Sequence, residues 1–154
     1  MDIQDRAGFS GAELISVRIG EQQFALDIMA VREIRGWTAS TPMPHAPSYV
    51  VGMINLRGVV LAVVDLGARL GLGACQPDSS SVVVVAHIRG IPVGLLVDAV
   101  CDIIAVTEDM VQPPPSLGTE EVREFVQGII STDDGIVTLL SLEQVLPTEQ
   151  RVAA

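Results

Sequence analysis

The side chains that most often carry chemistry are few and scattered in this sequence. The histidines, His45 and His87, and the cysteines, Cys75 and Cys101, do not cluster at the short spacings that metal sites use. No nucleophile stands in a recognisable frame with a histidine and an acid, so a catalytic triad would have to be assembled by the fold alone. The sequence therefore predicts no enzyme activity, no metal and no cofactor. An enzyme site assembled around His87 or Asp98 remains the alternative.

Two glycine-containing segments resemble parts of known ligand-binding loops but lack the other residues that such loops need. Gly71-Leu72-Gly73 lacks the further glycine and the Lys-Ser/Thr pair of a phosphate-binding loop, and we interpret it as the end of a helix. Asp133-Asp134-Gly135 lacks the later ligands and the closing glutamate of a calcium loop, and we interpret it as a hairpin turn. Neither segment predicts a ligand site.

The composition favours a protein that binds other proteins. The chain has 154 residues, 49% of them hydrophobic, and a formal net charge of −10. Nucleic acids and anionic lipids are poor partners for such a chain, because both are bound mainly by Lys and Arg that neutralise phosphates. No apolar stretch approaches the ~18 residues of a membrane span, and no secretory signal precedes Ile15. We therefore expect a cytoplasmic protein with unpaired thiols.

One arginine stands out because the chain has only nine basic residues. Arg57 precedes Gly58 at a predicted turn between apolar strands, where its methylenes can cover apolar surface while its guanidinium points outward to a partner helix. The alternative is a solvated turn arginine. Val31 and Ile34 are three residues apart, so a helical turn would place them on one face, with Glu33 at the rim of a contact.

The rest of the chain consists of strand-sized segments separated by turns. Residues 1–12 show no apolar period and are expected to form a flexible leader. Alternating apolar residues on both sides of Gly20-Glu21 predict a first hairpin. Further hairpins are predicted at Arg57-Gly58, Arg89-Gly90 and Asp133-Asp134-Gly135. Prolines at positions 42, 44, 47 and 113–115 predict two extended connectors.

An internal repeat links the two halves of the chain. Gly52-Met53-Ile54, a turn and Asp65-Leu66 resemble Gly128-Ile129-Ile130, a turn and Ser141-Leu142, at an offset of 76 positions (128 − 52 and 141 − 65). Asp65 and Ser141 are good N-caps, so each is expected to begin a short helix, which ends at Gly71 in the first copy and at Pro147 in the second. Earlier in each half, residues Val31 to Ile34 correspond to residues Val100 to Ile103.

These patterns predict a mainly β fold with two related subdomains. Short strands, close turns and little helix favour small antiparallel barrels, one over residues 13–76 and one over residues 81–147. The strands are rich in valine on both faces, which suggests that each sheet is covered by its own interior and by its neighbour. We therefore expect one shared core. A single sandwich with a similar number of strands is the alternative.

Two motifs resemble the chemotaxis coupling-protein (CheW) family. They are Val31-Arg32-Glu33-Ile34-Arg35-Gly36-Trp37 and Gly52-Met53-Ile54-Asn55-Leu56-Arg57-Gly58. The similarity continues through Pro44 and Pro47, Val63-Val64-Asp65-Leu66, Gly94-Leu95-Leu96-Val97-Asp98 and Gly128-Ile129, and it covers residues 13 to about 147. Many members have proline where this chain has Ala62 and aspartate where it has Ser141; both changes suit the predicted strand and cap.

The resemblance implies two SH3-like barrels on a common core within a single CheW-like domain, residues 13–150, with no active site and no cofactor. It implies an adaptor that joins the cytoplasmic tip of a chemoreceptor to the regulatory domain of the histidine kinase CheA. Carried over by position, the receptor-binding residues are Val31, Glu33, Ile34, Gly52 and Arg57. The hairpins of the second subdomain are a suggested kinase contact. A kinase-regulatory fragment, or a coupling domain joined to a receiver, is disfavoured by the chain length.

Overall fold

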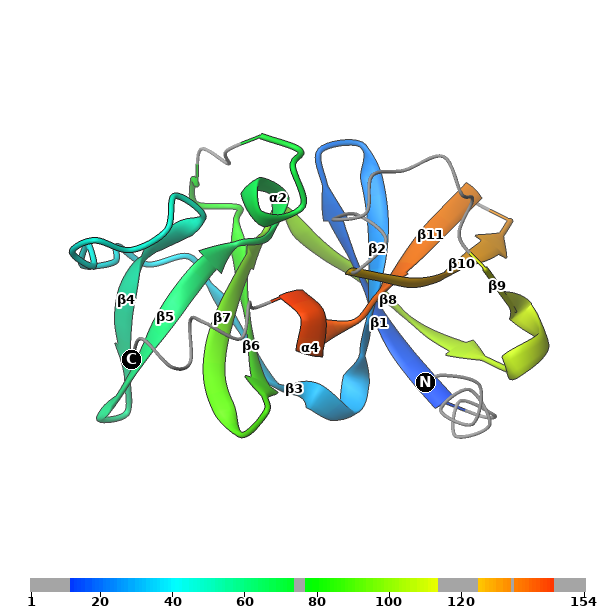
Figure 1. Cartoon of the computed structure of the whole chain (residues 1–154), viewed down its shortest axis with the longest axis horizontal. Coiled ribbons are helices and arrows are strands. Elements are labelled where there is room, and N and C mark those ends of the chain that lie inside the picture. The colour runs from blue at the N-terminus through cyan, green and yellow to red at the C-terminus, as the bar shows by residue number, and fades with distance from the viewer. Residues whose placement is uncertain (1–11, 74–76, 114–124, 134, 146–154) are drawn as a thin grey trace.

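The computed structural model describes residues 12–73, 77–113, 125–133 and 135–145, and these residues form mostly β-strands (Figure 1). The strands are β1 (Ala12–Ile19), β2 (Gln22–Asp27), β3 (Val31–Gly36), β4 (Val50–Leu56), β5 (Val59–Asp65), β6 (Val82–Ile88), β7 (Ile91–Val97), β8 (Ala99–Val106), β9 (Val111–Gln112), β10 (Val126–Thr132) and β11 (Gly135–Leu140). The helices are the short 3-10 helices η1 (Ile28–Ala30) and η2 (Glu108–Met110) and the α-helices α2 (Leu66–Arg69) and α4 (Leu142–Val145). Residues 1–11 of the predicted leader lie outside the described residues, as do Cys75, Pro114, Pro115, Asp134 and Pro147, whereas Ala12 is the first residue of β1.

The strands form two sheets that lie side by side, with α2 and α4 near the middle of the molecule (Figure 1). The first sheet has the order β8-β1-β2-β11-β10-β9, and the second has the order β3-β6-β7-β5-β4. Among the described residues, backbone pairing links the strands of each sheet in a line and does not join the first strand to the last. The prediction of a mainly β chain with two β subdomains is confirmed.

The predicted hairpins are confirmed, and two of them use the same kind of turn. Arg57 and Gly58 have φ values of 53° and 88°, and Arg89 and Gly90 have φ values of 54° and 79°. Positive φ at both central residues is the pattern of a type I′ turn, whose twist matches that of the two strands it joins. The side-chain oxygen of Asn55 accepts a hydrogen bond from the Gly58 N–H at 2.9 Å, which stabilises the β4–β5 turn.

The internal repeat is also confirmed. The hairpin β4–β5 leads into α2, and the hairpin β10–β11 leads into α4. In both copies the residue before the helix donates its N–H, at 2.7 Å, to an aromatic residue: Asp65 to the carbonyl of Tyr49, and Ser141 to the carbonyl of Phe125. The predicted cap at Asp65 is present, because its carboxylate accepts from the Ala68 N–H.

The sheets do not follow the predicted division of the chain into about residues 13–76 and about residues 81–147. Hairpin β1–β2 joins β8 to β11, whereas hairpin β6–β7 joins β3 to β5. Each half of the chain therefore contributes its first hairpin to the sheet that contains the other half's remaining strands. The physical reason is the parallel pairing of β5 with β7 and of β11 with β2. Parallel neighbours cannot be joined by a tight turn, so distant segments supply them.

The largest group of buried apolar side chains lies between the two sheets. It includes Ile15 and Leu26 from the first sheet and Val84 and Leu95 from the second. Burial of this surface from water is the main force that holds the two sheets together. The expectation of a shared core is confirmed.

Each sheet also covers a smaller apolar cluster on its other face. One cluster includes Leu14 and Ile130 of the first sheet, and the other includes Leu61 and Val83 of the second. A single sandwich buries only the two facing sides of its sheets. The clusters on the outer sides therefore exclude the sandwich alternative and explain why the strands are rich in valine on both faces.

Three further observations concern residues considered in the sequence. His87 is exposed on β6. Cys101 is an exposed free thiol. Within the described ranges, no helix has the length and apolar content needed to cross a bilayer.

The register of β5 predicts that substitutions at two adjacent positions change the free energy of unfolding by very different amounts. Leu61 is 3% exposed and Val60 is 60% exposed. Leu61→Ala should lower the free energy of unfolding by roughly 2–5 kcal/mol, because it leaves a cavity in the cluster of the second sheet. Val60→Ala should change it by no more than about 0.5 kcal/mol. Chemical denaturation of both variants measures the difference, and equal effects would show that the register is wrong.

Candidate functional site

The receptor-binding residues predicted from the resemblance lie on the second sheet, on its two end strands and on the turn between its last two strands. Glu33 is on β3, which is the first strand of this sheet, and Arg57 is in the turn that joins β4 to β5 at the other end of the strand order. The connector between β3 and β4 contains the prolines at positions 42, 44 and 47, from which it was predicted, and it has little regular structure. The sheet curves enough for side chains from its opposite ends to meet, because Arg57 and Glu33 are hydrogen-bonded.

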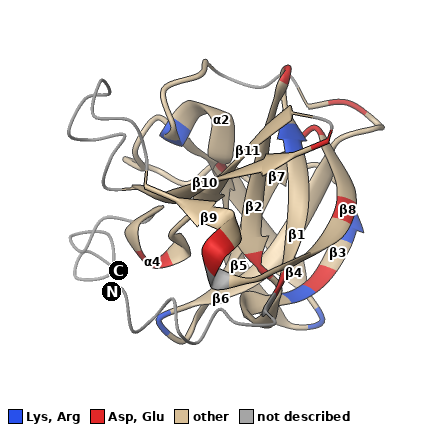
Figure 2. Cartoon of the chain, turned by 90° about the vertical axis from the view of Figure 1, so that its right-hand side faces the viewer, with Lys and Arg blue, Asp and Glu red and all other residues tan. Residues whose placement is uncertain are grey.

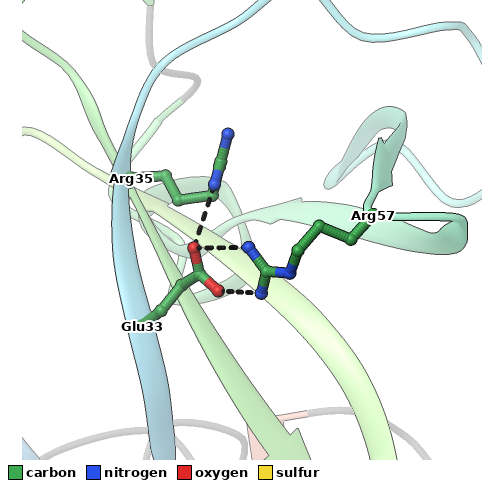
Figure 3. Close-up of polar contacts among 3 residues, drawn as sticks. All are labelled: Glu33, Arg35 and Arg57. Carbon is green, nitrogen blue, oxygen red and sulfur yellow. Dashed lines mark hydrogen bonds and ion pairs between the residues drawn. The ribbon is translucent and has the colours of Figure 1, made fainter.

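Three charged side chains meet at this place, and we call them the Glu33 cluster: Glu33, Arg35 and Arg57 (Figure 3). The Arg57 guanidinium donates from Nη2 to Oε1 of Glu33 and from Nη1 to Oε2 at 3.5 Å. Arg35 donates from Nη1 to the same Oε2 at 2.9 Å. The side chains of Arg57, Arg35 and Glu33 are 68%, 40% and 26% exposed, so the cluster is open to a partner.

The two arginines change the electrostatics of the carboxylate. The hydrogen bonds from Arg57 lower the pKa of Glu33 most, and the hydrogen bond from Arg35 lowers it further. The Glu33 carboxylate in turn raises the pKa of Arg57. The chain as a whole is acidic, and Figure 2 shows its charges as short segments scattered along ribbons that are mostly uncharged. The Glu33 cluster, with two cations and one anion, is thus a locally positive place on a negative protein.

The geometry corrects the picture of an outward-pointing Arg57. Its guanidinium points toward β3 and pairs with Glu33, so the donor fork is already occupied in the isolated chain. Arg35 was missed by the sequence reasoning. The signal was present, because Glu33 and Arg35 are two residues apart and a strand places such residues on the same face.

The expected helical turn at Val31 and Ile34 is wrong, because these residues belong to strand β3. They still share a face, for a different reason. The register shifts between Val31 and Glu33, so Val31 lies opposite Ala86 and Ile34 lies opposite Val84. These partners are two apart on β6 and therefore point to the same side. Val31 packs partly buried against the shared core, whereas Ile34 is exposed.

Gly52 is buried on β4 and has a packing role. A Cβ on it would lie 2.6 Å from both the Ser40 hydroxyl and the Thr41 carbonyl oxygen, which is too close for any residue with a side chain. Thr41 and Met53 exchange backbone hydrogen bonds of 2.9 and 2.7 Å beside this contact. Gly52 thus allows the connector to lie against the edge of β4 and fixes its path.

The alternative of an enzyme site concerned Asp98 and His87. Asp98 accepts a hydrogen bond from the Gly20 N–H at 2.7 Å and so stabilises the turn of the first hairpin. His87 is an exposed residue of β6. In the part of the chain that the structure describes, no three His, Cys, Asp or Glu side chains form a group that could hold a metal ion.

Comparisons with known proteins agree with the fold and the motifs. The family model for the CheW-like domain matches residues 13–150. The Chemotaxis protein CheW of Rhizobium meliloti (strain 1021) is 50% identical over 144 residues, which are 94% of this chain and 93% of that protein. The crystal structure of scaffolding protein TtCheW from Thermoanaerobacter tengcongensis superposes with a TM-score of 0.81 at 32% identity and covers 90% of this chain and 89% of that chain.

A more distant relative, the Chemotaxis protein CheW of Bacillus subtilis (strain 168), is 28% identical over 146 residues. Its match spans 94% of this chain and 93% of that protein, so the similarity again extends over nearly the whole length. The chain therefore belongs to the CheW-like family, the coupling and scaffold proteins of chemotaxis, which are adaptors and not enzymes. This confirms the resemblance found in the sequence.

The close approach at Gly52 predicts the effect of adding one methyl group. Gly52→Ala should lower the free energy of unfolding by roughly 1–3 kcal/mol, because the backbone of Thr41 would have to move. Gly36→Ala is the matched control, since a Cβ there meets nothing within 4 Å. Denaturation curves that place both variants at the wild-type midpoint would contradict the close approach.

The Glu33 cluster predicts a pH dependence. The folded-state pKa of Glu33 lies below its unfolded value, so its contribution to stability is present above the unfolded pKa and is lost as the pH falls through the folded pKa. Carboxyl-carbon NMR should give a Glu33 titration midpoint below the usual glutamate range. Arg57→Ala should move that midpoint upward, and Arg35→Gln should move it upward by less. An unchanged midpoint in Arg57→Ala would contradict the pairing.

Proposed function

We propose that this chain couples chemoreceptors to the histidine kinase CheA, and that the Glu33 cluster with the adjoining apolar side chains forms the receptor contact. The observation that carries the proposal is the exposed pairing of Arg57 with Glu33 on an otherwise acidic protein. Val59 and Val60 follow the Arg57 turn and are both exposed. A few apolar anchors with a charged rim form the usual pattern of a small signalling interface.

The other predicted receptor residues have distinct parts in this proposal. Ile34 is exposed on the end strand β3, on the face opposite Glu33 and Arg35, and supplies apolar contact area at this edge of the sheet. Val31 sets the position of β3 by packing on the shared core, and Gly52 sets the path of the connector. These two residues therefore act by holding the surface in shape. The partner that fits is a helical segment carrying both apolar side chains and carboxylates, which is the chemistry expected at a receptor tip.

We further propose that the regulatory domain of CheA binds elsewhere, at the hairpins of the second half of the chain, β6–β7 and β10–β11. Two separate surfaces are what an adaptor requires, because it must hold both partners at once. Exposed apolar side chains at Ile91 and Ile136 on these hairpins support this choice. The protein acts in the cytoplasm and reaches the membrane through its receptor partner.

The receptor contact is tested by reversing one charge. Arg57→Glu should weaken binding to a receptor-tip fragment by roughly five- to thirtyfold, because it removes the donor fork and adds a carboxylate beside Glu33. Binding to the CheA regulatory domain should be unchanged. Calorimetry measures both affinities, and circular dichroism checks the fold. Arg18→Glu, which makes the same charge change on β1, is the matched control and should bind normally.

A charge-exchanged variant distinguishes a direct contact with the receptor from a role of the ion pair in holding the sheet together. Glu33→Arg combined with Arg57→Glu restores an ion pair between strand and turn but presents a carboxylate at the tip of the hairpin. We expect its affinity for the receptor fragment to stay low. Recovery to the wild-type affinity would mean that the pair serves only to hold the sheet together, and equal affinities of wild type and Arg57→Glu would reject the receptor contact at this site.

A further inference from the structure

Glu33 is shared between two arginines that reach it in different ways. Its Oε2 accepts from Arg35 at 2.9 Å and from Arg57 at 3.5 Å, while its Oε1 accepts from Arg57 alone. Figure 3 shows the two guanidiniums approaching the carboxylate from different sides. Arg35 extends from the same strand as Glu33, whereas Arg57 extends from the turn of another hairpin. One carboxylate therefore has a partner from its own strand and a partner from a separate element.

This sharing matters when an acidic partner arrives. In the isolated chain the Arg57 fork is occupied by Glu33, so a partner carboxylate must compete for it. If Arg57 were the sole counter-ion, its departure would leave the Glu33 charge unpaired beside the incoming carboxylate. Like charges at such short distance repel each other and weaken binding. A second cation that stays with Glu33 removes much of this cost.

Arg35 has the position that such a cation needs. It is two residues from Glu33 on β3, so the strand places both side chains on the same face at a short separation. Its side chain is 40% exposed, less than the 68% of Arg57. The Arg57 side chain is therefore the more accessible of the two to a partner, whereas Arg35 is kept near Glu33 by the strand that both residues share.

We propose that Arg35 is a positioning residue of the receptor contact: it retains the Glu33 carboxylate while Arg57 exchanges that carboxylate for one on the partner. The proposal rests on the proposed function, because it requires Arg57 to meet the receptor. Arg35 acts through Glu33 and does not itself need to touch the partner. It should matter only while Glu33 carries its negative charge.

A double-mutant cycle between positions 33 and 35 tests the exchange. Arg35→Gln should weaken binding to the receptor-tip fragment by roughly three- to tenfold, as expected for the loss of one coupled charge. In a Glu33→Gln background the same change should alter affinity by less than about twofold, because no charge remains to be held. Arg35→Lys keeps the cation and should bind within about twofold of wild type. Thermal unfolding checks that every variant is folded.

The outcomes are distinct. A loss on Arg35→Gln that is equally large in the Glu33→Gln background would show that Arg35 contacts the receptor directly, and it would overturn the proposal. Wild-type affinity for Arg35→Gln would overturn it too, while the Arg57→Glu result would still support the receptor contact. If Arg57→Glu also binds normally, the proposed receptor site itself fails. Should Arg35→Gln not fold, the comparison of Arg35→Lys with wild type still decides, since a large loss there would contradict a role through charge.

Discussion

The structure depends on the burial of apolar surface between the two sheets. Most of this core comes from two hairpins that have changed places: β1–β2 of the first half of the chain and β6–β7 of the second. Because each of these hairpins also pairs in parallel with a strand from the other half of the chain, neither sheet is complete without segments from both halves. The Glu33 cluster depends on this arrangement, since β3 is held in place by β6.

Arg69 contacts both repeats near the helices. The guanidinium carbon of Arg69, on α2, lies 4.4 Å from the ring centre of Phe125 and 5.0 Å from that of Tyr49. These aromatic residues are equivalent in the repeat, at the same offset of 76 (125 − 49). Arg69 also donates to the carbonyl of Val145, which is its own equivalent (145 − 69 = 76). Cation–π contacts and this hydrogen bond thus tie the two hairpin–helix units together.

The repeat duplicated the scaffold but not the charged site. The position equivalent to Arg57 is Asp133 (57 + 76). The segment that corresponds to Val31–Ile34 in the other half of the chain has Asp102 at the place of Glu33. Two carboxylates cannot form the pair seen on the second sheet. Asp102 instead accepts a hydrogen bond from the Ile103 N–H at 2.8 Å. The receptor contact proposed for this protein therefore belongs to one sheet, although the hairpins that frame it occur twice.

Much of the local structure could be predicted from the sequence, because its causes are local. Alternating apolar residues, Arg-Gly turns and the Asp65 cap act over a few positions, and they led to the hairpins, the short helix and the repeat. The family motifs singled out Glu33 and Arg57. The tertiary structure alone decided that the two halves exchange hairpins, that Val31 to Gly36 is a bulged strand, and that Arg57 turns back to a carboxylate 24 positions earlier, which Arg35 shares. These features follow from which strands pair and how the sheet curves, and pairing is set by the burial of surfaces from distant segments that no local pattern encodes.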